Sequence, residues 1–313
     1  MARALVFPGQ GSQTVGMGKA LADAVPTARA VFEEVDEALN QNLSRLMFEG
    51  PIEELTLTEN AQPALMAMSL AVVRVLRHDG GLEFGRHCQF VAGHSLGEYS
   101  ALCAADALDL DETARLLKRR GQAMQQAVPV GQGAMAALLG LDFETAQAVA
   151  RDAAEGQVCD IANDNAPGQV VVSGNVEAVE RAVDLARERG ARRPMLLPVS
   201  APFHCALMQP AADVMADALR QSQLRAPVVP LIANVNASAV SEPAEIRDLL
   251  VKQVTAMVRW RESVLFLRGQ DVDNLVEVGA GKVLTTMLKR IDKEISGQAV
   301  SEPEDIEAFL KSL

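Results

Sequence analysis

The chain has 313 residues, 49% of them hydrophobic, and a formal net charge of −12 at pH 7. Its length fits one large domain, alone or with a smaller appendage, and its charge argues against nucleic acid or an anionic membrane as a main partner. No apolar run approaches the ~18 residues that span a bilayer, and residues 1–8 are too short for a signal peptide, so we expect a cytoplasmic protein. The four cysteines show no Cys-x-x-Cys spacing. They are expected to be reduced thiols that bind no metal.

The first part of the chain alternates apolar segments with breaks. Residues 2–7 predict a buried strand that ends at residues 8–13, a glycine-rich turn without the Gly-Lys-Ser/Thr ending of a phosphate loop. Val31, Val35 and Leu39 recur every four residues with glutamates between them, which indicates an amphipathic helix. The other elements expected before residue 129 are a short helix after Pro51, a buried helix over 64–76, a polar loop over 79–87 and a helix over 111–128.

A Gly-x-Ser-x-Gly motif at residues 93–97 follows a short apolar segment and precedes a helix-forming one. A nucleophile elbow requires this strand–turn–helix context. Gly93 and Gly97 let two stretches of backbone approach closely in a tight turn. The backbone N–H of Leu96 falls at a helix start, where it can stabilise an oxyanion. Such motifs also occur by chance in ordinary turns, but the context favours Ser95 as a nucleophile.

The pattern changes at residues 129–133, where proline and glycines interrupt it. From there the sequence predicts strand, helix, two strands, helix and strand, the βαββαβ order that is typical of a ferredoxin-like fold. We therefore expect an α/β protein in two parts. One is an α/β-hydrolase-like catalytic domain with a parallel sheet, from residues 1–128 and 201–313; the other is an inserted ferredoxin-like subdomain, residues 129–200. The expected strands are 134–139, 158–162, 169–173, 195–199, 228–233 and 275–278. Helices are expected over 143–154 and 176–188, and two more follow His204: one ends at about residue 222, and the other supplies Gln253.

A serine nucleophile requires a general base, and the chain contains four histidines. His78 and His87 lie in or beside a polar loop and are expected to face solvent. His94 is adjacent to Ser95, but neighbouring side chains diverge at a sharp turn, so a structural role is expected. His204 remains, at the junction of the two parts. Serine before histidine matches the α/β-hydrolase-like chain order, although a purely structural His204 is the alternative.

Four segments together resemble the malonyl-CoA:acyl-carrier-protein transacylases of fatty-acid synthesis. They are Phe7-Pro8-Gly9-Gln10-Gly11-Ser12-Gln13, Gly93-His94-Ser95-Leu96-Gly97-Glu98-Tyr99, Pro202-Phe203-His204-Cys205 and Glu277-Val278-Gly279-Ala280-Gly281. The similarity runs essentially end to end and includes the inserted unit. One departure is Asp106, where family members commonly carry glycine. Because Asp106 follows the elbow helix, we expect altered local packing and unchanged chemistry.

The resemblance implies roles for particular residues. Ser95 would be acylated and His204 would be the general acid and base. The backbone amides of Gln10 and Leu96 would form the oxyanion hole. Gln253 would orient the histidine through its backbone carbonyl, in place of a triad carboxylate.

The family's arginine that binds the malonyl carboxylate matches Arg120. A carboxylate carried into a dry pocket is costly unless it is paired, and a guanidinium offers it a planar fork of two donors. From the residues alone, Lys118, Arg119 and Arg120 are more simply interpreted as a solvated helix face. Only the resemblance singles out Arg120 over Arg119.

The sequence thus predicts a ping-pong acyltransferase that moves malonyl from coenzyme A to Ser95 and then to the phosphopantetheine thiol of an acyl carrier protein. Malonyl-CoA is a substrate, no bound cofactor is expected, and the protein is expected to be a monomer. Two alternatives stay open: a thioesterase or esterase, and a non-enzymatic module that binds carrier proteins. Because carrier proteins are acidic like this chain, docking is expected to use a local basic surface: Lys282, Lys289, Arg290 and Lys293.

Overall fold

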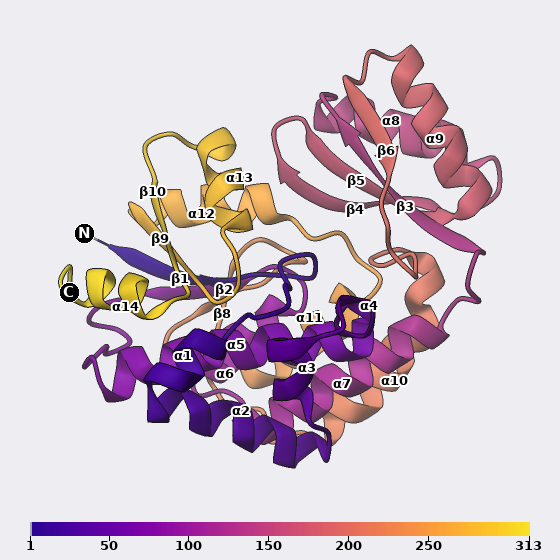
Figure 1. The fold of residues 1–313 in the computed structure, drawn as a ribbon. Coiled ribbons are helices and arrows are strands. Elements are labelled where there is room, and N and C mark those ends of the chain that lie inside the picture. Colours follow the sequence, from indigo (N-terminus) through magenta and orange to yellow (C-terminus); the bar gives the residue numbers. More distant parts are fainter. Residues whose placement is uncertain (1) are drawn as a thin grey trace.

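The structure, a computed structural model, describes residues 2–313 and contains two units (Figure 1). The larger unit is built on a six-stranded sheet in which every neighbouring pair is parallel except β7 and β8. This confirms the mixed α/β fold with a parallel sheet. Its strands are, in sheet order, β10 (Ser296–Val300), β9 (Asn274–Val278), β1 (Arg3–Phe7), β2 (Phe90–Gly93), β7 (Leu231–Ile232) and β8 (Ala239–Val240).

Both faces of the sheet are buried at its centre, which explains why β1 and β2 are mainly apolar. Along β1, Leu5 and Phe7 point into one core while Ala4 and Val6 point into another, because successive side chains of a strand alternate between faces. The second core is closed by α12 (Trp260–Gly269) and α13 (Val283–Ile291). The first core is closed by α1 (Lys19–Ala24), α2 (Pro26–Leu39), α3 (Leu43–Glu49), α4 (Ile52–Thr56), α5 (Thr58–His78), α6 (Gly97–Ala104), α7 (Leu110–Gln126), α10 (Gln209–Gln221), α11 (Pro243–Gln253) and α14 (Pro303–Leu310).

The smaller unit has its own antiparallel sheet, with the strand order β4-β5-β3-β6. Ala136, Leu138 and Val172 pack against its two helices in a separate core, whereas Met135 and Val171 on the opposite face join the first core of the larger unit. The elements follow the expected βαββαβ order: β3 (Gly133–Leu139), α8 (Phe143–Ala154), β4 (Cys159–Ala166), β5 (Gln169–Asn175), α9 (Val176–Glu188) and β6 (Arg193–Leu196).

Strand β4 ties the smaller unit to the larger one. The Asp164 backbone N–H donates to the Val258 carbonyl at 3.0 Å, and the Val258 N–H donates to the Ala162 carbonyl at 2.9 Å. The Asp164 carboxylate is 1% exposed and pairs with the Arg261 guanidinium at 2.7 Å. These bonds fix the position of β4, and with it one wall of the space between the two units.

Four expected elements differ from the observed ones. The strand expected over 158–162 continues to Ala166 as β4. The strand expected over 195–199 is β6 (Arg193–Leu196), and the residues after it leave the sheet. The strand expected over 228–233 pairs only at Leu231–Ile232, since Pro230 has no N–H to donate to a ladder. Helix α5 begins at Thr58, before Pro63, because its buried faces pack on α2 and α7 and outweigh the helix-breaking tendency of proline. The sequence did not predict α1, α3, β8, α12, β10 and α14.

Asp106 adopts a backbone conformation that glycine adopts without strain. Its φ is +61°, in the left-handed region, and its carboxylate accepts two hydrogen bonds from the Arg77 guanidinium at 2.7 and 2.9 Å. The residue lies at the turn after α6, away from the carboxyl ends of the central strands. A glycine at position 106 could not make this ion pair with Arg77.

No helix within residues 2–313 combines the length and the apolarity needed to cross a membrane.

Candidate active site

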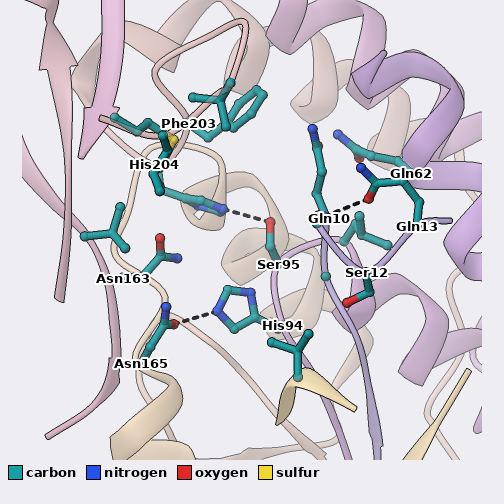
Figure 2. Close-up of a pocket in the computed structure, with 18 of the residues that line it drawn as sticks. Gln10, Ser12, Gln13, Gln62, His94, Ser95, Asn163, Asn165, Phe203 and His204 are labelled. Carbon is teal, nitrogen blue, oxygen red and sulfur yellow. Dashed lines mark hydrogen bonds between the residues drawn. The ribbon is translucent and has the colours of Figure 1, made fainter. Parts of the chain in front are cut away.

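A cavity of about 400 Å³ lies between the two units, at the carboxyl ends of β1 and β2. The loop after β1, the Gly-x-Ser-x-Gly turn and α7 form its walls in the larger unit. From the smaller unit, Met135, Asn163, Asn165 and the segment after β6 complete it (Figure 2). In open α/β sheets, ligands bind outside the carboxyl ends of the strands, so this cavity is the candidate active site.

The turn after β2 has the close packing of a nucleophile elbow. A side chain at Gly93 would come within 1.9 Å of the Gly97 carbonyl carbon, and one at Gly97 would come within 2.3 Å of the Phe7 oxygen. Ser95, with φ +54°, lies in a conformation that non-glycine residues rarely adopt. Asn234 holds the turn from outside: its Oδ1 accepts from the Ser95 N–H at 2.8 Å and its Nδ2 donates to the Gly93 carbonyl at 2.7 Å.

The Ser95 hydroxyl points at His204 (Figure 2), and 2.8 Å separates Oγ from Nε2. On the far side of the ring, Nδ1 lies 2.8 Å from the Gln253 backbone carbonyl. A carbonyl only accepts, so Nδ1 carries the hydrogen and Nε2 is left to accept the serine proton. Burial, and then the nearby positive charge of Arg120, lower the pKa of His204 to about 3. The imidazole is therefore neutral near pH 7.

Two backbone N–H groups near the serine are free to bind an oxyanion. Gln10 follows β1 and Leu96 follows Ser95, and both line the cavity. Strands β1 and β2 are parallel neighbours with Phe7 opposite Gly93, which brings the two loops together. Within residues 2–313 neither N–H donates a hydrogen bond. Both donors are thus available beside Ser95.

Arg120 brings a positive charge to the nucleophile from α7. Its side chain is 1% exposed, whereas Arg119 on the same helix is exposed. Nη1 donates to Gln62 Oε1 at 2.8 Å, and Nη2 donates to Gln253 Oε1 at 2.8 Å and to Ser95 Oγ at 3.2 Å. All three acceptors are uncharged, and Nε finds no acceptor within residues 2–313. A buried cation with only neutral partners is suited to an anionic ligand.

The chain was compared with known families and structures. The acyl transferase domain family matches residues 4–304. The malonyl CoA-acyl carrier protein transacylase of Escherichia coli (strain K12) is 46% identical over 308 residues, which cover 98% of each chain. That of Bacillus subtilis (strain 168) is 45% identical over 99% of this chain and 96% of its own length. This chain belongs to the malonyl CoA-acyl carrier protein transacylase family.

Solved structures of this family superpose closely on the chain. The acyl-carrier-protein-S-malonyltransferase from Bartonella henselae is 55% identical, with a TM-score of 0.98 and coverage of 100% of this chain and 99% of its own. A malonyl-transacylase solved in complex with a type II PKS acyl-carrier protein is 43% identical, with a TM-score of 0.97 and full coverage of both chains. The family expected from the sequence is confirmed, and with it the expectation of an acyltransferase.

Sequence reasoning missed three residues that support the acyltransferase site. Gln62 and Asn234 contact Arg120 and the elbow from distant parts of the chain, and nothing in their local sequence signals a role. Glu98 is 1% exposed, and its Oε2 accepts from Gln253 Nε2 at 2.6 Å. A single charged residue in the otherwise uncharged helix α6 was a signal that could have found it.

Of the other histidines, His94 and His78 lie where the sequence suggested, whereas His87 is less exposed than expected. His94 turns away from the serine, and its Nε2 is 2.8 Å from Asn165 Oδ1 (Figure 2). Its ring lies 5.9 Å from that of Trp260. His78 is exposed, and His87 is half-buried with Nδ1 accepting from the Glu83 N–H. Within residues 2–313, no group of three or more His, Cys, Asp or Glu side chains is arranged to hold a metal ion.

Proposed function

We propose that this chain carries malonyl groups from malonyl-CoA, as an ester on Ser95, to the phosphopantetheine thiol of an acyl carrier protein in fatty-acid biosynthesis. The observation that carries the proposal is the buried Arg120 guanidinium, 3.2 Å from the Ser95 hydroxyl. Malonyl bears a free carboxylate one methylene away from its thioester carbonyl. A cation beside the nucleophile therefore fits this acyl group and offers nothing to an uncharged one.

In the first half-reaction, Ser95 Oγ attacks the thioester carbonyl while His204 Nε2 accepts the hydroxyl proton. The carbonyl oxygen becomes an oxyanion, which the N–H groups of Gln10 and Leu96 stabilise. The carbon–sulfur bond then breaks, and the His204 proton passes to the departing coenzyme A sulfur. In the second half-reaction, the carrier-protein thiol gives its proton to His204 and its sulfur attacks the ester carbonyl carbon. The bond from this carbon to Ser95 Oγ then breaks, and the His204 proton passes to Oγ.

Gln253 and Arg120 position the reacting groups. The backbone carbonyl of Gln253 holds the His204 ring at 2.8 Å in the tautomer that leaves Nε2 free to accept. Burial and the nearby charge of Arg120 lower the pKa of His204 by more than this carbonyl raises it, so His204 stays unprotonated at physiological pH. Arg120 orients the malonyl carboxylate through two donors and so aims the thioester carbonyl at Ser95.

The proposal also assigns a role to each of the two units. We assign residues 1–128 and 201–313 to an α/β-hydrolase-like catalytic domain, supported by the parallel sheet and the elbow after β2. Residues 129–200 are assigned to a ferredoxin-like subdomain, supported by the βαββαβ order and its separate core. The protein acts as a cytoplasmic monomer without a bound cofactor, and its four unpaired, buried cysteines suit a reducing compartment.

The proposed partner is an acyl carrier protein, which docks along α13, where Lys282 precedes the helix and the other basic residues lie at and beyond its C-terminal end. Lys282, Lys289, Arg290 and Lys293 are exposed, while Val283 of the same helix lines the cavity. A carrier protein bound there would reach the cavity with its phosphopantetheine arm. The positive surface would also steer an acidic partner toward a chain whose net charge is −12.

Mass spectrometry of the protein after mixing with malonyl-CoA tests this function. A long-lived malonyl adduct that a carrier protein discharges supports the transferase. Rapid loss of the adduct to free malonate would identify a hydrolase instead. Absence of any adduct would leave a module that binds carrier proteins without catalysis.

A further inference from the structure

Helix α6 buries a carboxylate that the reaction described above does not use. Glu98 lies three residues after the nucleophile and is 1% exposed. Its Oε2 accepts from Gln253 Nε2 at 2.6 Å and from the Asn234 backbone N–H at 3.2 Å. Both donors are uncharged. An ionised carboxylate in such a place is costly unless a positive charge lies nearby.

The nearest positive charge is Arg120, and the side-chain amide of Gln253 lies between the two charges. Its nitrogen donates to Glu98, while its oxygen accepts from Arg120 Nη2 at 2.8 Å. The amide orientation is therefore fixed by a carboxylate at one end and a guanidinium at the other. In the empty site, Glu98 and Arg120 form a charge-balanced pair through one neutral group.

Malonyl brings a second carboxylate to the same guanidinium. One buried cation would then face two buried anions, and the excess negative charge would be unfavourable in a cavity of low polarity. Protonation of Glu98 removes this excess. Because both hydrogen-bond donors reach Oε2, Oε1 is the oxygen that can take the proton without losing either bond.

We propose that Glu98 is the counter-charge of Arg120 in the empty site, that the malonyl carboxylate replaces it, and that Glu98 takes up one proton from solvent as malonyl-CoA binds. The inference rests on the proposed role of Arg120. Glu98 is then a positioning residue that sets the charge of the acyl site through Gln253. The proton returns to solvent when the malonyl group leaves on the carrier protein.

Among the titratable groups around it, Glu98 is the one with a pKa near neutral pH. Burial raises the pKa of Glu98 to about 7, against the smaller effects of its two hydrogen bonds and of Arg120. Tyr99, its neighbour on α6, has its pKa raised by burial to about 12, and that of His204, beyond Gln253, is lowered to about 3. Gln253 on α11 and Asn234 after β7 carry no charge.

Proton uptake by Glu98 makes the affinity for malonyl-CoA depend on pH. Bound malonyl raises the pKa of Glu98 further, so binding favours the protonated carboxyl. Affinity for malonyl-CoA is highest below about pH 7, where Glu98 of the free protein is already protonated. Above that pH it falls by up to about tenfold per unit, as expected for the uptake of one proton. Acetyl-CoA has no acyl carboxylate and is expected to show no such fall.

Binding is measured in the Ser95→Ala variant, which holds the thioester without reacting. Calorimetry between about pH 6 and 9 gives the dissociation constants of malonyl-CoA and acetyl-CoA, and buffers of different ionisation enthalpy give the protons taken up. The acetyl-CoA measurement is subtracted to remove any proton exchange by the phosphates of coenzyme A. In Ser95→Ala we expect malonyl-CoA to take up close to one proton more than acetyl-CoA above pH 7. In Ser95→Ala/Glu98→Gln we expect no difference between the two ligands. The glutamine amide oxygen can still accept both hydrogen bonds that Glu98 accepts.

Two outcomes would overturn the proposal. Equal proton uptake for malonyl-CoA and acetyl-CoA in Ser95→Ala itself would refute it without any change at Glu98. An unchanged malonyl pH slope in the Glu98→Gln double variant would assign the proton to another group. The Ser95→Ala/Arg120→Ala variant tests the role of Arg120 separately from that of Glu98. If it binds malonyl-CoA as tightly as its parent at pH 6, the role of Arg120 fails, whatever the pH slope.

Discussion

Replacement of Arg120 by alanine is expected to separate acyl selectivity from catalysis. The guanidinium is 1% exposed, and its three hydrogen-bond acceptors are uncharged. In the variant, the malonyl carboxylate would enter a cavity without a cation to pair with. Truncation of one member of a buried charge pair costs about 2–5 kcal/mol, roughly thirtyfold to several thousandfold in rate.

The surroundings of Arg120 place the expected cost of Arg120→Ala for malonyl transfer in the lower half of this range of about 2–5 kcal/mol. Gln62 Nε2 makes only a weak 3.7 Å contact with the Met124 sulfur, so this amide is free to turn and donate to the carboxylate. One neutral donor replaces part of the lost interaction. We therefore expect a loss of about 3 kcal/mol, roughly a hundredfold, in kcat/KM for malonyl transfer.

The assay compares malonyl-CoA and acetyl-CoA with one carrier protein. Acetyl lacks the carboxylate, and the His204 ring is held by a backbone carbonyl rather than by Arg120. Acetyl transfer should therefore hold steady or improve, and the malonyl-to-acetyl ratio should collapse. Arg119→Ala is the matched control, since Arg119 is exposed on the same helix. An equal fall for both substrates in Arg120→Ala would make Arg120 structural and refute the reasoning.

Four further predictions follow from the site. Ser95→Ala should abolish the malonyl adduct without changing the melting temperature, and an adduct on another residue would overturn the assignment. His204→Ala should slow acylation by roughly 10²–10⁴-fold; near-normal rates would move the role to His94. Because burial lowers the pKa of His204 to about 3, the acylation rate with acetyl-CoA should stay level from pH 8 to 5, and a decline near pH 6.5 would contradict the neutral imidazole. Lys289→Glu/Arg290→Glu should raise the KM for carrier protein but not that for malonyl-CoA; an unchanged KM at low salt would exclude this surface.

The features that the sequence predicted well depend on neighbouring residues. The elbow follows from Gly93 and Gly97 and from the strand and helix beside them, and these glycines have no room for a side chain. The βαββαβ unit likewise follows from the order of its apolar segments. The choice of Arg120 over Arg119 required the family resemblance, since the two residues differ only in which helix face is buried.

The features that the sequence did not predict depend on distant contacts. Asn234 binds the elbow across 139 positions of the chain, and no local pattern marks it. The strand expected over 228–233 was shortened because Pro230 cannot donate to β2. The role of Glu98 depends on Gln253 and Arg120, which approach it only in the folded chain.

The pairing of the N-terminal strand β1 with β9 (Asn274–Val278) has a consequence for the newly made protein. The loop that carries Gln10 is fixed on both sides only after almost the whole chain has left the ribosome. The base at His204 and the carbonyl at Gln253 also arrive late in synthesis. A nascent chain therefore displays the Ser95 turn without the groups that activate it. Acyl thioesters in the cell therefore meet an activated serine only once the last strands have joined the sheet.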